Sequence, residues 1–496
     1  MQPTDRRRTA AAGYRLELRP VFYIIGFLLI VMAVTMTIPL ATDLVAGNRD
    51  WVAFAMSSMI TLFIGGALVT ACYQPAIELN LRQAFVLTTL SWVMIAAASA
   101  LPFYFSPYRF NLAESYFEAM SGLTTTGATM MVGLDRAPAG LLLWRALLQW
   151  MGGIGIIGFG IAILPFLRIG GMQLFHSESS DRSDKVVPRV SDLAVSIGAI
   201  YLVFTVLCFG MLRLVGMGPF DAITHAMAAV STGGFSTKDA SVAYWSDAGV
   251  HWTLIIFMVA GGLPFVRYIS FVRGNYGVFW RDSQVRRFLG VLVFGWAIVA
   301  ALLLATSDRN FWQALTLSAF NVTSVLTTTG FALDDYTRWG VWAVGLFFLM
   351  LFVGGCTGST SGGVKIFRLE ILWLMLRHQL VRLYSPHQVR PLEYNEKPFG
   401  HDVVISVAAF IFVYMASFLI VATALALLGL DFETAVSGAA SALGNVGPGY
   451  GETIGPAGNF ASVPNTAKWV LSFAMLLGRL EFFSVLVMMT PGFWRR

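Results

Sequence analysis

Residues 121–129 read SGLTTTGAT, a run of small and hydroxyl-bearing residues around one glycine. Three later segments resemble it: residues 228–236 read AAVSTGGFS, residues 324–332 read SVLTTTGFA and residues 441–449 read SALGNVGPG. One such segment would indicate only an ordinary outer turn. Four copies, each about a hundred residues from the next, indicate an internal repeat that decides the architecture of the chain.

Aligning the four segments brings one glycine of each copy into register. The aligned glycines are Gly127, Gly234, Gly330 and Gly447. In the second copy Gly233 precedes the aligned glycine, so a shift of that register by one residue stays open. Each segment also follows residues suited to a short helix, namely 113–123, 221–230, 311–325 and 432–443. Acidic residues near their starts favour helix N-termini. These residues are Glu114, Asp221, Asp308 and Asp431.

The composition places most of the chain in a membrane. Of its 496 residues, 57% are hydrophobic and 12% are charged, whereas a soluble domain carries about 25% charged residues. This deficit of charge excludes a soluble enzyme. A helix needs ~20 mainly apolar residues to cross a bilayer. Ten segments approach or exceed that length, namely 21–42, 51–72, 83–106, 138–166, 191–216, 251–272, 286–306, 339–378, 402–429 and 465–490.

We therefore expect an all-α membrane protein with ten spanning helices. Eight of them form four repeats of helix, pore helix, filter loop and helix around one pore, and two extra spans precede the repeats. The expected parts are residues 1–80 for the N-terminal pair, 81–168, 189–274, 284–380 and 400–496 for pore repeats 1 to 4. We interpret the first apolar segment as a retained membrane helix rather than a signal peptide, because no clear cleavage site follows it.

The basic residues predict the orientation of these spans. Most of the 33 Lys and Arg residues fall on one side if the N-terminus is placed inside the cell. The outer segments then hold only Arg49, Arg109, Arg136, Lys238, Arg309, Arg338 and Lys468. Because cytoplasmic connections carry an excess of Lys and Arg, we expect both termini to be cytoplasmic.

The four glycine segments are expected to form an ion filter. Non-helical backbone is tolerated at membrane depth only where it is buried or lines a wet cavity, and loop carbonyls can replace the hydration shell of an ion. Glycine allows the positive φ that turns successive carbonyls to one axis, and the C-terminal end of each short helix favours a cation. The loops hold no carboxylate, which suits a monovalent cation better than Ca²⁺. The expected filter residues are Thr125, Thr126, Gly127, Thr232, Gly233, Gly234, Thr328, Thr329, Gly330, Asn445, Val446 and Gly447.

The chain resembles the Trk/Ktr/HKT superfamily of potassium transporters, and most closely the bacterial Trk-type membrane subunit. The resemblance covers nearly the whole chain and is most distinctive in GNVGPG at 444–449, QWMGGIGI at 149–156 and LLGRLEFF at 476–483. It implies potassium uptake across the inner membrane, because glycine at all four filter positions goes with potassium permeation in this superfamily. It also implies a homodimer with one pore per subunit and a cytosolic, nucleotide-binding regulatory subunit as partner.

A glycine-rich stretch interrupts the long apolar segment 339–378. Residues 354–363 read GGCTGSTSGG, which is not an ordinary lipid-facing helix. The resemblance implies an intramembrane gating loop below the filter; a static packing kink is the alternative. The expected gate residues are Gly354, Gly355, Thr357, Gly358, Ser359, Thr360, Ser361, Gly362 and Gly363, together with Arg479.

Arg479 is an ionisable residue deep in the last apolar segment. It lies ~22 Å along a helix that begins after Pro464, at ~1.5 Å per residue, and such a residue usually faces a cavity or a partner. The resemblance implies an electrostatic barrier in the pore. The alternative is an ion pair, either with Glu481 or with a group on another helix, although Glu481 lies on a different helix face.

Two other classes of function are the alternatives to a potassium channel-like pore. A secondary transporter coupled to protons or sodium would need a relay of carboxylates or histidines in the spans, and few candidates exist. A membrane-embedded enzyme would need clustered His, Asp, Glu or Cys residues, and the sequence offers no such cluster. We expect no enzyme activity, no covalently bound cofactor and no nucleic-acid partner; potassium is the transported substrate and the bilayer is the surrounding medium.

Overall fold

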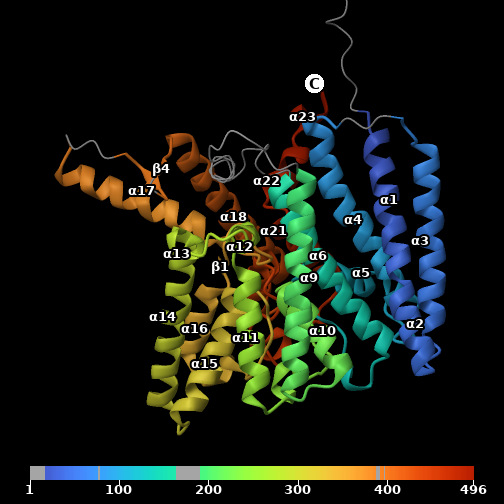
Figure 1. Cartoon of the computed structure of the whole chain (residues 1–496), viewed down its shortest axis with the longest axis horizontal. Helices are drawn as coiled ribbons and strands as arrows, with labels where there is room; N and C mark the ends of the chain where they lie inside the picture. Colours follow the sequence, from blue (N-terminus) through green and yellow to red (C-terminus); the bar gives the residue numbers. More distant parts are fainter. Residues whose placement is uncertain (1–16, 76–78, 163–189, 387–390, 396, 496) are drawn as a thin grey trace, which may run out of the picture.

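A computed structural model describes residues 17–75, 79–162, 190–386, 391–395 and 397–495 of the chain. Helices make up most of this part of the protein (Figure 1). The strands among the described residues are two short pairs: β1 (Val353–Gly354) lies parallel to β2 (Val364–Lys365), and β3 (Glu393–Tyr394) lies antiparallel to β4 (Lys397–Pro398). The expectation of an essentially α-helical chain is confirmed.

The first two apolar segments form a tightly packed pair of helices. Helix α1 (Arg19–Thr35) continues into α2 (Thr37–Ala46), and α3 (Trp51–Ala71) returns beside α1 (Figure 1). A Cβ atom built on Gly26 would lie 2.8 Å from the carbonyl oxygen of Gly65. The two backbones can approach this closely because small residues occupy the contact, as is common between helices in membranes.

Four consecutive groups of helices follow, and each contains a short helix after a long one. The first group contains α4 (Leu81–Phe105), α5 (Leu112–Leu123), the 3₁₀ turn η1 (Leu134–Arg136) and α6 (Ala139–Ala162). The second contains α9 (Val190–Leu214), α10 (Pro219–Val230), η2 (Ser241–Tyr244), α11 (Ala248–Gly262) and α12 (Phe265–Val272). The predicted boundaries at 168 and 189 lie outside the described residues.

The third and fourth groups repeat this order. The third contains α13 (Val278–Arg281), α14 (Ser283–Thr306), α15 (Phe311–Leu326), η3 (Tyr336–Trp339), α16 (Val341–Met350) and α17 (Ile366–Tyr384). The fourth contains α18 (His401–Leu427), α19 (Phe432–Gly444), α20 (Gly451–Ile454), α21 (Asn465–Arg479), α22 (Phe483–Leu486), η4 (Val487–Met489) and α23 (Pro491–Arg495). The short helices α5, α10, α15 and α19 agree with the four predicted stretches to within a residue or two.

Several of the predicted spans are bent rather than straight. Helices α11 and α12 meet at 95°, where Pro264 caps α12, and α21 meets the α22–η4 segment at 108°, where Glu481 and Phe482 both adopt positive φ. Among the described residues seven helices are long and apolar enough to cross a membrane, or up to nine if each bent pair is one span. The chain is therefore a multi-pass membrane protein, and ten spans remain a prediction.

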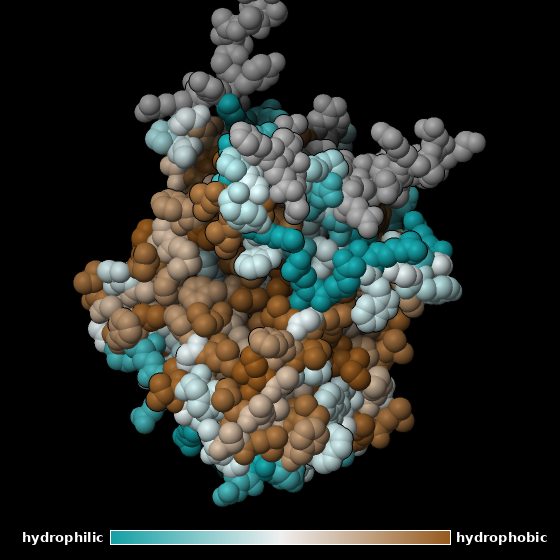
Figure 2. Space-filling view, turned by 90° about the vertical axis from the view of Figure 1, so that its left-hand side faces the viewer, coloured by the Kyte–Doolittle hydropathy of each residue, from teal (hydrophilic) through white to brown (hydrophobic). Residues whose placement is uncertain are grey.

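The surface agrees with this placement in a bilayer. Figure 2 shows a broad hydrophobic band with hydrophilic residues gathered at both ends of the molecule. Large apolar side chains face outward on the long helices, for example Phe63, which is 78% exposed, and Phe412, which is 74% exposed. The start of α1 and the C-terminal α23 lie at the same end of the molecule (Figure 1).

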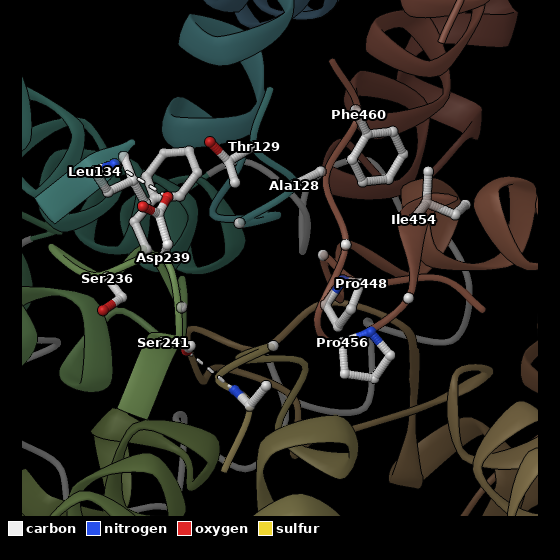
Figure 3. Close-up of a pocket in the computed structure, with 18 of the residues that line it drawn as sticks. Ala128, Thr129, Leu134, Ser236, Asp239, Ser241, Pro448, Ile454, Pro456 and Phe460 are labelled. Carbon is white, nitrogen blue, oxygen red and sulfur yellow. Dashed lines mark hydrogen bonds between the residues drawn. The ribbon is translucent and has the colours of Figure 1, made fainter. Parts of the chain in front are cut away.

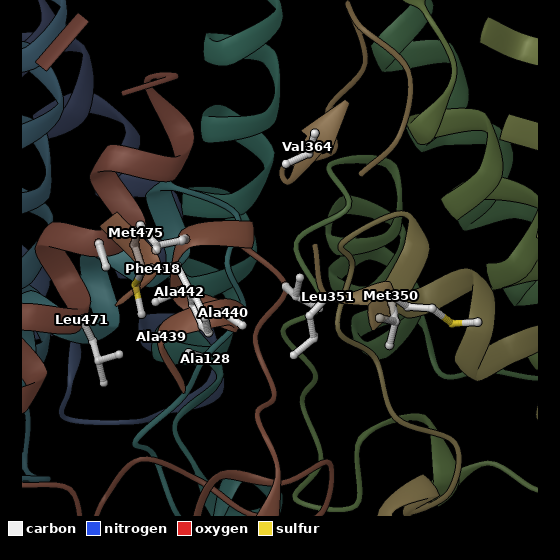
Figure 4. Close-up of a cluster of buried hydrophobic side chains, with 14 of the residues drawn as sticks. Ala128, Met350, Leu351, Val364, Phe418, Ala439, Ala440, Ala442, Leu471 and Met475 are labelled. Carbon is white, nitrogen blue, oxygen red and sulfur yellow. The ribbon is translucent and has the colours of Figure 1, made fainter. Parts of the chain in front are cut away.

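The core is built from small residues where the short helices pack. Ala439, Ala440 and Ala442 of α19 face Leu471 and Met475 of α21 in a cluster of fully buried side chains (Figure 4). Alanine lets α19 approach its neighbours closely. This packing holds α19 in the buried core, with its C-terminal end at a glycine loop.

Candidate functional site at the four glycine loops

Side-chain caps fix where three of the four short helices begin. Asn111 accepts a hydrogen bond from the Glu114 backbone nitrogen in a capping box, and Asp431 accepts one from the Thr434 nitrogen at 3.0 Å. For α15 the cap is Asn310, whereas Asp308, expected only as an acidic residue near the helix start, precedes it by two residues. An N-cap side chain must reach the backbone nitrogen two or three residues into the helix, which here is that of Gln313.

All four short helices end in the same left-handed turn. The residues in this turn are Thr125 (φ 53°), Thr232 (φ 51°), Thr328 (φ 57°) and Asn445 (φ 52°). In each case the next N–H group donates back to the last turn of the helix: Thr126 to Ser121, Gly233 to Ala228, Thr329 to Ser324 and Val446 to Ser441. This pattern is a Schellman motif, which usually uses glycine at the left-handed position. Threonine there is strained, and such strain clusters at functional sites.

A second left-handed residue follows in every loop, and it is always the aligned glycine. Gly127, Gly234, Gly330 and Gly447 have φ of 82°, 78°, 83° and 109°. The alignment of the second copy on Gly234 is therefore the one that its backbone shares with the other loops, and Gly233 occupies the position before it. Gly127, Gly234 and Gly330 are partly exposed, whereas the residues before them are buried.

The four loops meet in a closed ring. A Cβ atom added to any aligned glycine would overlap a carbonyl oxygen of the next loop. Gly127 meets the oxygen of Gly233, Gly234 that of Thr329, Gly330 that of Val446, and Gly447 that of Thr126, at 2.7 Å in the last case. The order around the ring follows the order along the chain, and the fourth loop closes on the first. The structure thus brings the twelve predicted filter residues to one place.

The ring faces a hollow of about 70 Å³ that all four glycines line (Figure 3). Loops from different groups are tied together around it. Asp239 accepts hydrogen bonds from the backbone nitrogens of Gly133 and Leu134 at 3.0 Å, and the Ser241 hydroxyl accepts one from the Ala332 nitrogen at 3.2 Å. Hydrogen bonds therefore join the first three loops to one another around this hollow.

Three buried side chains behind the ring were not predicted from the sequence as site residues, namely Glu118, Arg145 and Gln149. Arg145 of α6 pairs with Glu118 of α5 at 2.8 Å, and both are at most 1% exposed. One turn further along α6, Gln149 donates to the Gly233 carbonyl and accepts from the Phe235 nitrogen. The available signal was an arginine inside a span with a polar residue four positions on, which share one helix face.

Residues 354–363 lie against the other side of the ring. Thr360 is fully buried: its backbone nitrogen and hydroxyl both donate to the Gly261 carbonyl, and its hydroxyl also accepts from Thr232 of the second loop. The Gly362 nitrogen donates to the Thr328 hydroxyl of the third loop at 2.6 Å. All of the predicted gate residues of this stretch lie in one segment that begins in β1 and ends before α17, and this segment interrupts the helix as expected.

Arg479 joins this segment. It is 2% exposed and donates to the carbonyls of Thr360 at 2.8 Å and Gly152 at 3.3 Å. Glu481 pairs instead with Arg368 of α17. Within the described part of the chain no carboxylate lies within ion-pair distance of Arg479, so the alternative of a pair with Glu481 is not what the structure shows.

The described residues contain no group of three or more His, Cys, Asp or Glu side chains able to hold a metal ion. The candidate site is instead made of backbone carbonyls and small residues at the centre of an apolar helical bundle. This fold and site define a multi-pass membrane protein of the transport class.

Comparison with known proteins identifies the family. Residues 51–494 match the family model TrkH, described as a cation transport protein. The chain is 46% identical to the Trk system potassium uptake protein TrkI of Halomonas elongata, over 96% of this chain and 97% of that protein. It is 36% identical to the Trk system potassium uptake protein TrkH of Escherichia coli K12, over 97% and 100%. It also superimposes on the crystal structure of the potassium transporter TrkH from Vibrio parahaemolyticus, with a TM-score of 0.90, 34% identity and coverage of 97% and 100%. The chain belongs to the TrkH family of cation transport proteins.

Proposed function

We propose that this protein takes up potassium ions across the bacterial inner membrane through one pore made of four repeats. The observation that carries the proposal is the closed ring of glycine loops, in which each glycine leaves room for a carbonyl of the next loop. Carbonyl oxygens held around one axis can replace the hydration shell of a potassium ion. The relatives named as potassium uptake proteins support the same substrate.

The residues of the ring have assigned roles in this proposal. The left-handed Thr or Asn residue, the residue after it and the aligned glycine of each loop form the selectivity filter. The four short helices end at the ring, so their partly negative C-terminal ends favour a cation there. The transported ion needs no further cofactor in this scheme, and the protein is a transporter rather than an enzyme.

Residues 354–363 and Arg479 form the gate in this proposal. They fill the space on the inner side of the ring, where the Arg479 guanidinium donates to the Thr360 carbonyl. A positive charge beneath a cation filter opposes passage, because an ion pays a high electrostatic cost near a like charge in a medium of low dielectric constant. Glycine at both ends of the stretch gives the backbone the freedom to move aside.

The membrane arrangement completes the proposal. Ten spans arranged as an N-terminal pair and four pore repeats, with both termini in the cytoplasm, fit the common end of α1 and α23. The cytoplasmic side would receive a nucleotide-binding regulatory subunit of the Trk type. A homodimer is supported by α17, which projects from the body (Figure 1) and exposes apolar side chains such as Leu383, 81% exposed.

Coupled transport is the second mechanism to be tested. Its support is weaker, because four of the buried carboxylates are paired with arginines instead of forming a relay, namely Glu118, Asp282, Glu370 and Glu481. The test is cation flux through the purified protein in liposomes loaded with potassium, rubidium or sodium, with and without an imposed membrane potential. Flux that follows the potassium gradient and the potential supports a pore. Potassium flux that occurs only with a proton or sodium gradient would establish coupling, and no potassium flux would refute the proposal.

A further inference from the structure

One position on each short helix lies against the part of its own loop that follows the aligned glycine. Glu118, His225, Asn321 and Gly438 stand at the same sequence distance before the four aligned glycines. The side chain at each position, or at the residue directly before it, forms a hydrogen bond with a residue two or three places after the aligned glycine. The side chains at these positions differ in chemistry, so each of the four loops is held by a different kind of hydrogen bond.

The first two positions bind the side chain that follows the glycine by two residues. The Glu118 carboxylate accepts from the Thr129 hydroxyl and from the Met130 nitrogen, both at 2.9 Å. In the second loop the ring of His225 lies 3.0 Å from the Ser236 hydroxyl. Its other nitrogen lies 2.8 Å from the Asp221 carbonyl oxygen, which can only accept. The hydrogen of the neutral imidazole is therefore on that nitrogen, and in this form Ser236 donates to His225.

The other two loops are held by neutral groups. The Asn321 side-chain oxygen accepts from the Leu333 nitrogen at 3.3 Å, which corresponds to the Met130 nitrogen of the first loop. In the fourth loop the position is Gly438, and the preceding Ser437 hydroxyl accepts from the corresponding Tyr450 nitrogen at 2.8 Å. The carboxylate of Glu118 is thus peculiar to the first quarter.

This carboxylate is joined to the second loop through Arg145. The guanidinium donates to Glu118 at 2.8 Å, to the Thr129 hydroxyl at 3.0 Å and to the Ser236 carbonyl at 2.9 Å. It also lies 4.0 Å from the ring centre of Phe235. One buried planar cation therefore spans the boundary between the first and second loops, directly outside Gly127 and Gly234.

We propose that Glu118 and Arg145 are positioning residues that set the spacing of the first and second loops and thereby the ion selectivity of the ring. The inference rests on the filter proposed above. Hydrogen bonds to ionised groups are shorter and stronger than neutral ones, and a buried network holds its members in one geometry. A ring whose carbonyls are held less firmly adapts to ions of other sizes, so sodium and rubidium gain relative to potassium.

Two substitutions loosen this link without removing a side chain. Glu118→Gln keeps an acceptor for the Met130 nitrogen but loses the charge that holds Arg145. Arg145→Lys keeps the charge but cannot reach Glu118, Thr129 and Ser236 at once, since lysine lacks the planar fork. The matched control is Glu114→Gln on the same short helix, where the carboxylate pairs with Lys468 at 3.2 Å and contacts none of the ring residues.

The experiment measures the permeability of potassium relative to rubidium and sodium in liposomes, together with the melting temperature of each purified variant. Gly127→Ser serves as the reference for a damaged filter. We expect the potassium-to-sodium ratio to fall about tenfold in Glu118→Gln and in Arg145→Lys, the size of change expected for loss of one charge-assisted contact. In Glu114→Gln the ratio is expected to stay at the wild-type value.

The outcomes separate this inference from the proposed function. If Gly127→Ser lowers the ratio while both Glu118→Gln and Arg145→Lys keep it, the filter stands and the positioning role is overturned. If Gly127→Ser itself keeps the ratio, the filter and this inference both fall. Should Glu118→Gln not fold, Arg145→Lys decides, because it leaves no unpaired charge in the core. A change in melting temperature with an unchanged ratio shows a structural role alone and refutes the inference.

Discussion

Gly127→Ser puts a side chain where the ring leaves room only for a neighbouring carbonyl. Gly127 has a φ of 82°, and its added Cβ would overlap the Gly233 oxygen. The backbone strain of a non-glycine residue in this region amounts to about 1–2 kcal/mol. The overlap comes in addition, and it can be relieved only if the first and second loops move apart. We expect the protein to fold with reduced stability and with a widened ring.

Gly133→Ser provides the matched control for this substitution. Gly133 follows in the same loop with a φ of 77°, but a Cβ there has open space within 4 Å. Both variants therefore carry similar backbone strain, and Gly127→Ser alone disturbs the ring. Gly447→Ser should disturb the ring less than Gly127→Ser and more than Gly133→Ser. Its Cβ would lie 2.7 Å from the Thr126 oxygen, a less severe overlap than at the other aligned glycines.

Reversal potentials or competitive fluxes in liposomes give the potassium-to-sodium ratio of each variant. We expect Gly127→Ser to lose at least ~1.4 kcal/mol of discrimination between potassium and sodium, which is about tenfold in this ratio. We expect a smaller loss for Gly447→Ser and no loss for Gly133→Ser. A wild-type ratio in both Gly127→Ser and Gly133→Ser would show that the ring does not select the ion. A loss in Gly133→Ser as large as in Gly127→Ser would mean that strain in the loop, rather than overlap with the carbonyl, controls selectivity.

Three further perturbations test other parts of the structure. Arg479→Ala removes the buried cation next to Thr360, and basal flux without a partner should rise several-fold; an equal or lower flux in folded protein contradicts the barrier. Deleting residues 358–361 removes Thr360, through which residues 354–363 contact the second loop, and should also raise basal flux, whereas an unaltered flux argues for a static kink. Asp431→Ala removes the cap of α19 and should cost about 1 kcal/mol of stability at neutral pH. Hydrogen bonds from Thr434 hold the pKa of Asp431 below its ordinary value of 3.8. The stability that the cap contributes is therefore present above pH 3.8 and is lost as the pH falls through the lower pKa of the folded state. Equal melting temperatures of Asp431→Ala and wild type at pH 7 would contradict this role of the cap.

Local signals in the sequence were sufficient to predict the short helices and their loops. The stretch 432–443 was predicted from an acidic start and a glycine-containing end, and α19 spans Phe432–Gly444. Both signals depend only on neighbouring residues. A cap acts within the first turn of a helix, and the left-handed turn directly follows the last turn of the helix. The same locality explains why 354–363 was recognised as a break in an apolar segment.

Contacts between distant residues could not be predicted in this way. The pair of Glu118 and Arg145 depends on how α5 and α6 pack; Arg145 stands out as an arginine inside a span, but its own segment does not indicate its partner. The bends at Pro264 and at Glu481 were missed, because apolar composition continues across both positions and hides a change of direction. The cap of α15 was not predicted, because Asp308 indicates only an acidic helix start, and the capping hydrogen bond is made by Asn310.

The closure of the ring between Gly447 and Thr126 has a consequence for how the protein is made. The loops join in chain order, so during synthesis the first loop lacks one neighbour until the last one has been inserted. Every earlier stage leaves carbonyl groups of the first loop facing a gap at membrane depth, where unsatisfied backbone is costly. The ring is therefore complete only when α19 and the loop after it lie against both the third loop and the first.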